Sequence, residues 1–169
     1  MSLENYLDKS LKLNENRLKH SLKVGLEGEA LFKEITSAIK SEAEEDKKHI
    51  DFHWEGKKVD VKGLKKTQKL GYLLIEMINV YGGAGWCSKD SQAEYIAFQF
   101  PERFLVFNKN ILRKKVIELC EEYTKPLRKN RIPIEEGLYR WIGRYNRQDV
   151  FTYIKLSDVI DLVDYEIKY

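Results

Sequence analysis

The amino-acid sequence predicts one α/β domain in which a mixed sheet is flanked by helices. Two observations lead to this prediction. Apolar residues recur at helical spacing from Gly25 to Ser41, and segments with strand-like alternation follow between residues 49 and 100. A length of 169 residues fits one compact domain with a real core. The order helix, three strands, loop, strand and helix is typical of an α/β sandwich.

The helices are expected in four places. Residues 3–23 form a polar helical segment with a weak apolar stripe, and residues 25–41 form an amphipathic helix with a clear apolar face. A further helix is expected at 110–123, before Pro126, which cannot continue it. A short helix that Ser157 could cap is expected to end near Val163.

Six strands are expected, because apolar residues cluster or alternate in short runs separated by turn residues. They are placed at residues 49–54, 58–63, 71–80, 93–100, 138–142 and 150–154. We therefore divide the chain into a helical lead-in (1–24), a core (25–125) and a C-terminal extension of two strands and a helix (126–169) that packs on the core.

Composition narrows the class of protein. The hydrophobic fraction of 43% is that of a folded domain, and 30 Lys plus Arg against 27 Asp plus Glu leave a net charge of only +3. Cys87 and Cys120 form no CxxC pair, so neither a disulfide framework nor a zinc site is indicated. The N-terminus is charged and no apolar run has the length of a membrane span, so we expect a cytoplasmic protein without membrane contact.

Basic residues gather in two stretches that could contact phosphates, although charged surfaces carry such runs in any case. One stretch holds Lys57, Lys58, Lys62, Lys65, Lys66 and Lys69, and the other Arg113, Lys114, Lys115, Lys125, Arg128, Lys129 and Arg131. Within the first, Lys58, Lys65 and Lys66 are the candidates for nucleic-acid binding. Trp86 could stack on a base, with a packing role as the alternative.

The segment from His49 to Lys62 carries the candidate chemistry. As a hairpin that turns at Glu55-Gly56, it pairs apolar residues with one another and places Asp51 opposite Asp60. Period-two alternation puts Lys62 on the face of Asp60. Opposed like charges destabilise a strand pair, and a bound divalent cation would remove that repulsion. The alternative is a solvent-facing hairpin edge with ordinary charged residues.

These residues resemble the PD-(D/E)XK nuclease superfamily, with Asp51 as the isolated acid and Asp60-Val61-Lys62 as the acid-x-lysine. The superfamily begins with a helix that often carries a glutamate, which corresponds here to Glu29, with Glu27 as the alternative. Two positions depart from the pattern: no proline precedes Asp51, and the acid of the acid-x-lysine is aspartate.

The segments 74–86 and 93–98 are similar to phage-type endonucleases of this superfamily, in which the third strand carries a glutamate that matches Glu76. The resemblance covers about residues 25–100. It implies a restriction-endonuclease-like αβββαβ sandwich in which Asp51, Asp60 and Glu29 hold the metal ion, Glu76 is a further candidate ligand, and Lys62 assists the attacking water.

The expected function is that of a Mg²⁺-dependent deoxyribonuclease, with Mn²⁺ able to substitute, which cuts DNA internally. Branched DNA is an expected substrate because the pattern also resembles Holliday-junction resolvases; those act as dimers, so a homodimer stays open. No nucleotide cofactor is expected, because Gly82 to Gly85 lack the lysine and hydroxyl residue of a P-loop. The alternatives are a noncatalytic DNA-binding or assembly module with the same fold, and a protein-interaction domain.

Overall fold

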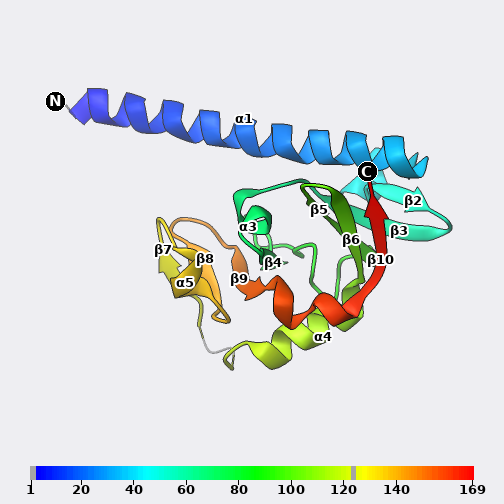
Figure 1. Ribbon diagram of the computed structural model, residues 1–169. Helices are drawn as coiled ribbons and strands as arrows, with labels where there is room; N and C mark the ends of the chain where they lie inside the picture. Colours follow the sequence, from blue (N-terminus) through cyan, green and yellow to red (C-terminus); the bar gives the residue numbers. More distant parts are fainter. Residues whose placement is uncertain (1–2, 123–124) are drawn as a thin grey trace.

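The computed structural model describes residues 3–122 and 125–169, with side chains placed from residue 19 onward within these ranges. This part of the chain forms two mixed β-sheets and five α-helices (Figure 1). The predicted α/β class is therefore confirmed.

The larger sheet has six strands in the order β1-β2-β3-β5-β6-β10. Its strands β3 and β5 run parallel, and its other neighbours pair antiparallel. The bounds are β1 (Ile39–Lys40), β2 (Phe52–Trp54), β3 (Lys57–Lys62), β5 (Tyr95–Phe100), β6 (Arg103–Asn108) and β10 (Val163–Lys168).

The smaller sheet has four strands in the order β4-β9-β8-β7, with β7 and β8 parallel. Its bounds are β4 (Tyr72–Ile78), β9 (Val150–Lys155), β8 (Ile142–Arg144) and β7 (Leu127–Lys129). The helices are α1 (Leu3–Thr36), α2 (Ala43–Asp46), α3 (Lys66–Lys69), α4 (Lys109–Leu119) and α5 (Ile134–Gly137), and 3₁₀ turns occupy Leu156–Asp158 and Ile160–Leu162.

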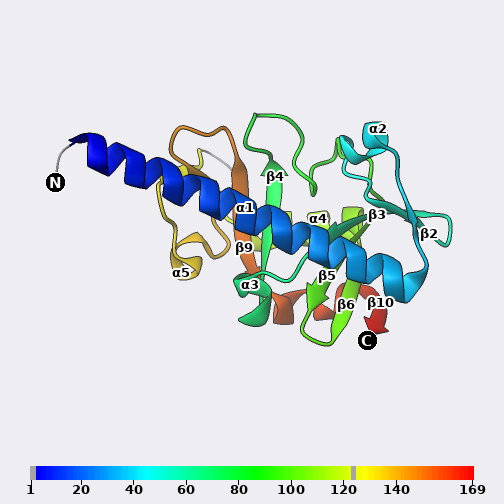
Figure 2. The same cartoon turned by 90° about the horizontal axis from the view of Figure 1, so that it is seen from above.

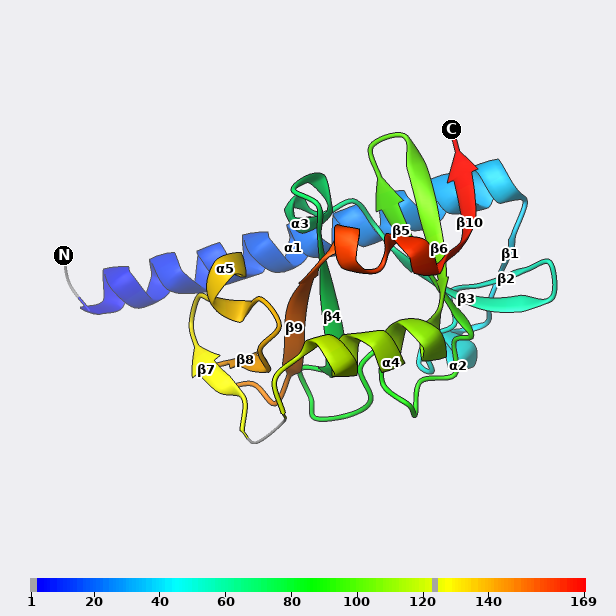
Figure 3. The same ribbon diagram turned by 60° about the horizontal axis from the view of Figure 1, so that its bottom comes forward.

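Helix α1 continues without a break past residue 24, the position at which the sequence predicted a boundary between the helical lead-in and the core. It ends earlier than the predicted Ser41, because Ser37 takes a positive φ of 56° and the chain then enters β1, which pairs with β2. Figure 2 shows α1 lying across one face of the molecule, and Figure 3 shows α4 on the other side.

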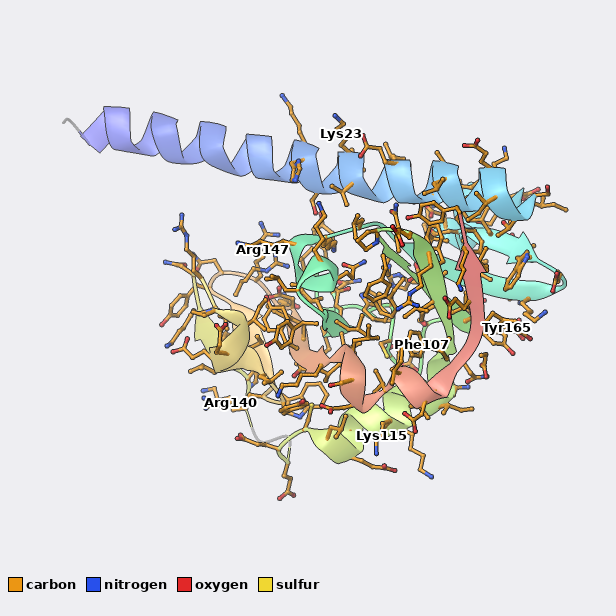
Figure 4. The ribbon with its side chains drawn as sticks, in the orientation of Figure 1. Lys23, Phe107, Lys115, Arg140, Arg147 and Tyr165 are labelled. Carbon is orange, nitrogen blue, oxygen red and sulfur yellow. The ribbon has the colours of Figure 1, made fainter. Side chains whose placement is uncertain are left out.

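Two apolar cores lie on opposite faces of the larger sheet. Under α1, Phe32 packs with Phe52, Val59, Val61 and the neighbouring strands. On the other face, the larger sheet, the smaller sheet and α4 share a second core whose fully buried members include Leu73, Phe107 and Leu112. Figure 4 shows Phe107 in this interior, whereas Lys115 lies on the outer side of α4.

The structure corrects three sequence predictions. The expected third strand, β4, pairs with β9 in the smaller sheet and does not join β2 and β3. The expected strand at 138–142 is shifted, since β8 begins at Ile142 and Leu138 makes only an isolated bridge. The expected helix at 157–163 is two 3₁₀ turns followed by β10, because the apolar residues there alternate and pair with β6.

Other predicted elements are present near their expected places. Helix α4 and strands β3, β5 and β9 lie within the predicted ranges or a residue or two from them. Strand β6 was not predicted, although its side chains fill both cores. Across the described ranges, no helix is both long enough and apolar enough to cross a membrane.

Candidate active site between the two sheets

The β2–β3 hairpin has the predicted register, with Phe52 opposite Val59 and Trp54 opposite Lys57. Its turn residues Glu55 and Gly56 have positive φ values of 49° and 75°, as a tight two-residue hairpin turn requires. The paired ladder stops at Phe52, so β2 is shorter than predicted. The three preceding residues, including Asp51, therefore lie outside the strand.

Asp51 takes the place that a longer β2 would have filled. Its N–H donates to the carbonyl of Val59 at 2.9 Å, and its Oδ2 accepts from the N–H of Val61 at 2.6 Å. The carboxylate thus satisfies an edge group of β3 that has no strand partner on this side. Asp51 is consequently buried, with 7% of its surface exposed.

Asp60 and Lys62 point away from α1, into the space between the two sheets. Val59 and Val61 belong to the core under α1, so alternation places Asp60 and Lys62 on the other face of β3. Lys62 Nζ lies 2.7 Å from Oδ2 of Asp60, whose side chain is 3% exposed. That oxygen lies at ion-pair distance but accepts no hydrogen bond of regular geometry, so it is under-satisfied for a buried carboxylate.

Burial and mutual repulsion control the charges of this cluster. Burial, and then the negative charge of Asp60, raise the pKa of Asp51 to about 8, against the opposing effects of Lys62 and the Val61 N–H. For Lys62, burial lowers the pKa, but Asp60 and Asp51 outweigh it and the net pKa is raised. The charged form of Lys62 is therefore favoured, and its ammonium contacts Asp60.

The smaller sheet contributes Glu76. The sequence predicted Glu76 for this site, but on a strand of the sheet that carries Asp60. It is half-buried on β4, and burial raises its pKa against the attraction of Lys62 and then His49. His49 Nε2 lies 2.8 Å from the carbonyl of Ala84 and so connects the glycine-rich loop to this region. Glu76 thus belongs to the electrostatic surroundings of Lys62 although its strand is in the other sheet.

Glu29 lies on α1, which covers the opposite face of β3. Its Oε2 accepts a hydrogen bond from Lys40 Nζ at 2.5 Å, and its charge contributes to the raised pKa of Asp51. Glu27, the alternative, is 64% exposed and pairs with Lys23 at 3.7 Å. Glu29 is therefore the helix acid near the cluster. Lys40 was not predicted, because a lysine in a two-residue strand carries no sequence signal.

Trp86 supports Lys62 rather than presenting a free ring. It is 5% exposed, packs edge-on against Phe98 at 5.5 Å between ring centroids, and has Lys62 Nζ 5.3 Å from its own centroid. A ring buried in this way must move before it could stack on a base. The packing alternative is the one that this geometry favours.

Part of the first basic stretch lies near the cluster. Lys65 and Lys66 are exposed at the start of α3, and Lys58 is half-buried on β3. Lys65 lies within electrostatic reach of Lys62 and Glu76, and Arg144 of β8 lies within reach of Lys65 and Glu76. Of the second basic stretch, Lys115 lies on α4, on the side of the molecule that is far from α1 (Figure 4).

The donor set fits a metal ion that needs few protein ligands. Among the residues that the structure describes, no three His, Cys, Asp or Glu side chains form a group that could hold a metal. Asp51 and Asp60 offer two carboxylates, one with an under-satisfied buried oxygen. Mg²⁺ is commonly held by one or two carboxylates, waters and substrate phosphate. Asp51 and Asp60 therefore fit Mg²⁺ better than an ion whose ligands all come from the protein.

Comparisons with known proteins find no counterpart for this chain. No family model matches it, no curated protein matches it, and no solved structure matches it.

Proposed function

We propose that this protein is a divalent-metal-dependent deoxyribonuclease that hydrolyses phosphodiester bonds. The observation that carries the proposal is the pair of buried aspartates, Asp51 and Asp60, with Lys62 as the cation in contact with Asp60. Burying two carboxylates together costs free energy unless a positive charge in addition to Lys62 lies beside them. The resemblance to the PD-(D/E)XK superfamily assigns the same three residues to the catalytic centre.

Asp51 and Asp60 would hold Mg²⁺, with Mn²⁺ able to substitute. When bound, such an ion neutralises phosphate charge and makes its coordinated water more acidic. The hydrogen bond from the Val61 N–H already orients the Asp51 carboxylate, so one of the two ligands is positioned in advance. Glu29 and Glu76 remain candidates for contacts through water, from α1 and β4 respectively.

Lys62 would act as a hydrogen-bond donor to the attacking water or to the phosphate. Its ammonium lies against Asp60, and the raised pKa keeps it charged. A charged lysine stabilises negative charge that develops on phosphate oxygens and orients a water, whereas it is a poor base. The indole of Trp86 beside it restricts where the ammonium can move.

The substrate would lie over the exposed lysines beside this cluster. Lys65 and Arg144 lie within electrostatic reach of Glu76, and Lys58 and Lys66 add positive charge on β3 and α3. Such residues bind phosphate without reading bases. DNA, including branched DNA, is the proposed substrate on the resemblance, and cleavage within the strand is proposed over cleavage from an end.

The test is cleavage of supercoiled plasmid, linear DNA, branched DNA and an RNA of the same sequence, with Mg²⁺, Mn²⁺ or a chelator. Asp60→Asn and Lys62→Met should each reduce cleavage at least a hundredfold, since each removes a group that acts in the reaction. Lys115→Met is the matched control: it deletes a lysine on α4 and should leave the rate unchanged.

Two results would overturn the nuclease proposal. One is a pure wild-type protein that cuts none of these substrates in either metal. The other is cleavage that survives both substitutions. Retained DNA binding without cleavage would then support the noncatalytic binding module, and Mn²⁺ binding measured by calorimetry on the wild type and on Asp60→Asn would show whether the acid pair holds metal at all.

A further inference from the structure

A fully buried acid, Asp149, lies at the turn that joins β8 to β9. Its side chain is 0% exposed, and both of its carboxylate oxygens accept hydrogen bonds from Arg144. Oδ1 accepts from the backbone N–H of Arg144 at 3.0 Å, and Oδ2 accepts from its Nε at 2.6 Å. A buried carboxylate needs such partners, because an unpaired buried charge costs several kcal/mol. Asp149 therefore holds the guanidinium of Arg144 by its inner nitrogen.

The backbone that carries Arg144 is held in place by a second arginine, Arg128 of β7. Its Nη1 donates to the carbonyl of Arg147 at 2.7 Å and to that of Arg144 at 3.2 Å. Gly143 allows this turn to close, because a Cβ there would lie 2.4 Å from the carbonyl oxygen of Asp149. The side chain of Arg144 thus starts from a fixed backbone and is fixed again at Nε.

The outer part of the Arg144 guanidinium points along the smaller sheet toward the candidate active site. Its Cζ lies 5.9 Å from the ring centroid of Phe151 on β9. Phe151 pairs in register with Glu76 of β4, so these two side chains lie on the same face of the sheet. The charge of Arg144 in turn acts on the carboxyl of Glu76. Glu76, Phe151 and Arg144 therefore form a row across three strands.

The outer nitrogens of Arg144 are available to a ligand. Within the part of the chain that the structure describes, Arg144 makes its ion pair with Asp149 through Nε, and neither Nη atom has a hydrogen-bond partner. Its side chain is 42% exposed. A second cation, Lys65, lies within electrostatic reach: burial, and then the charge of Lys62, lower the pKa of Lys65, and Arg144 adds to that effect. An anion beside Arg144 and Lys65 would relieve this repulsion.

We propose that Arg144 binds a phosphate group of the nucleic-acid backbone through its two Nη atoms, and that Asp149 is the positioning residue that orients it. The planar fork of arginine suits phosphate oxygens, and Nε is already used by Asp149. Glu76 opposes an anion here, but Lys62 and Lys65 offset its charge. This inference rests on the proposed function, and it places part of the substrate backbone over β8 and β9.

The first test is the binding of a short, fluorescently labelled DNA duplex by anisotropy, in chelator and at several salt concentrations. Arg144→Met should weaken binding roughly tenfold, because charge-assisted hydrogen bonds are lost. The slope of log affinity against log salt should fall by about 0.9, because one phosphate contact is removed. Arg140→Met is the matched control: its side chain is 45% exposed and pairs with Glu121 near the end of α4 (Figure 4), so both quantities should stay unchanged.

Asp149→Asn tests the positioning role through the sign of its effect. The substitution removes a negative charge, so net charge alone would strengthen DNA binding. If Asp149 orients Arg144, binding should weaken by nearly as much as in Arg144→Met, and the double variant should bind no more weakly than Arg144→Met. Asp161→Asn, at an exposed acid, is the control and should not weaken binding. Stronger binding by a folded Asp149→Asn overturns the positioning role.

Arg144→Lys keeps the test valid if Asp149→Asn does not fold. Lysine retains the positive charge and a partner for Asp149, but its single nitrogen cannot pair with Asp149 and also present a fork to phosphate. Its affinity and salt slope should match those of Arg144→Met, with far-UV circular dichroism unchanged. Wild-type affinity in Arg144→Lys or in Arg144→Met, or a wild type that does not bind the duplex, overturns the proposal.

Cleavage measured in parallel with Mg²⁺ separates this inference from the proposed function. Cleavage by a wild type whose DNA binding does not depend on Arg144 overturns the phosphate contact alone. Binding that depends on Arg144 and Asp149, in a protein that cuts no substrate, supports the phosphate contact and overturns the nuclease.

Discussion

At the scale of single residues, the short β2 strand explains why Asp51 is buried beside Asp60. The carboxylate of Asp51 replaces a missing strand partner for the Val61 N–H, and this contact holds it against the strand that carries Asp60. The hydrogen bond favours the charged form of Asp51, but burial and the second acid outweigh it. The stability of the metal-free protein should therefore depend on pH.

The expected pH dependence follows from the raised pKa of Asp51. An unfolded aspartate has a pKa of about 3.9, whereas the folded value is about 8. Between these values the unfolded chain has lost the proton and the folded chain keeps it. The stability contribution is thus fully present below about pH 4 and is lost as the pH rises through about 8. In chelator, urea unfolding should give a lower free energy of unfolding at pH 8 than at pH 5.

Asp51→Asn should remove much of this difference, because the amide does not titrate. Asp46→Asn, at an exposed residue of α2, is the control and should keep the wild-type slope. Equal slopes for Asp51→Asn and the wild type would contradict the assigned burial of this carboxyl.

At the scale of elements, the approach of α1 to β3 depends on glycine. A Cβ on Gly28 would lie 2.6 Å from the Cα of Gly63, and a Cβ on Gly63 would lie 2.1 Å from the carbonyl oxygen of Val24. Both contacts are with backbone, which cannot rotate away. The two glycines therefore set how closely the helix lies over the strand that carries Asp60 and Lys62.

Two glycines of the same helix should respond oppositely to alanine. Gly28→Ala should lower the melting temperature, because overpacking against Gly63 costs about 1–3 kcal/mol and exceeds the gain in helix propensity. Gly25→Ala should raise the melting temperature, because nothing lies within 4 Å of the added Cβ. The free energy of unfolding should increase by up to about 1 kcal/mol. Thermal unfolding measures both. A stabilising Gly28→Ala would mean that α1 does not lie this close to β3.

At the scale of the whole molecule, strands β5 and β6 connect the two cores. Each strand has residues that face α1 and residues that face the smaller sheet, as Ala97 and Phe98 of β5 do. Loss of packing on one face must therefore disturb the other. We expect the two sheets to unfold together.

Leu73→Ala tests this coupling. Leu73 is fully buried on β4, so the substitution should destabilise the protein by about 2–5 kcal/mol. Leu70→Ala, three residues earlier and 54% exposed, should change stability by less than about 0.5 kcal/mol. Unfolding curves from tryptophan fluorescence and far-UV circular dichroism should coincide in both variants. Two separated transitions in Leu73→Ala would show that the smaller sheet unfolds independently.

The sequence by itself determined the features that depend on neighbouring residues. The hairpin register follows from its turn and from period-two alternation, so the common face of Asp60 and Lys62 was predictable. Helix α4 followed from the spacing of its apolar residues. These patterns report which side of an element is buried, and they do so within a few residues of chain.

Only the tertiary structure decided which elements meet. The alternation of residues within β4 does not show that its partner is β9, some eighty residues later in the chain. The sequence therefore did not reveal that Glu76 lies near Lys62 from a second sheet. Lys40 and Arg144 join the surroundings of the site through strand pairings that carry no local signal. Long-range partner choice depends on the packing of the whole chain, which no short window of sequence contains.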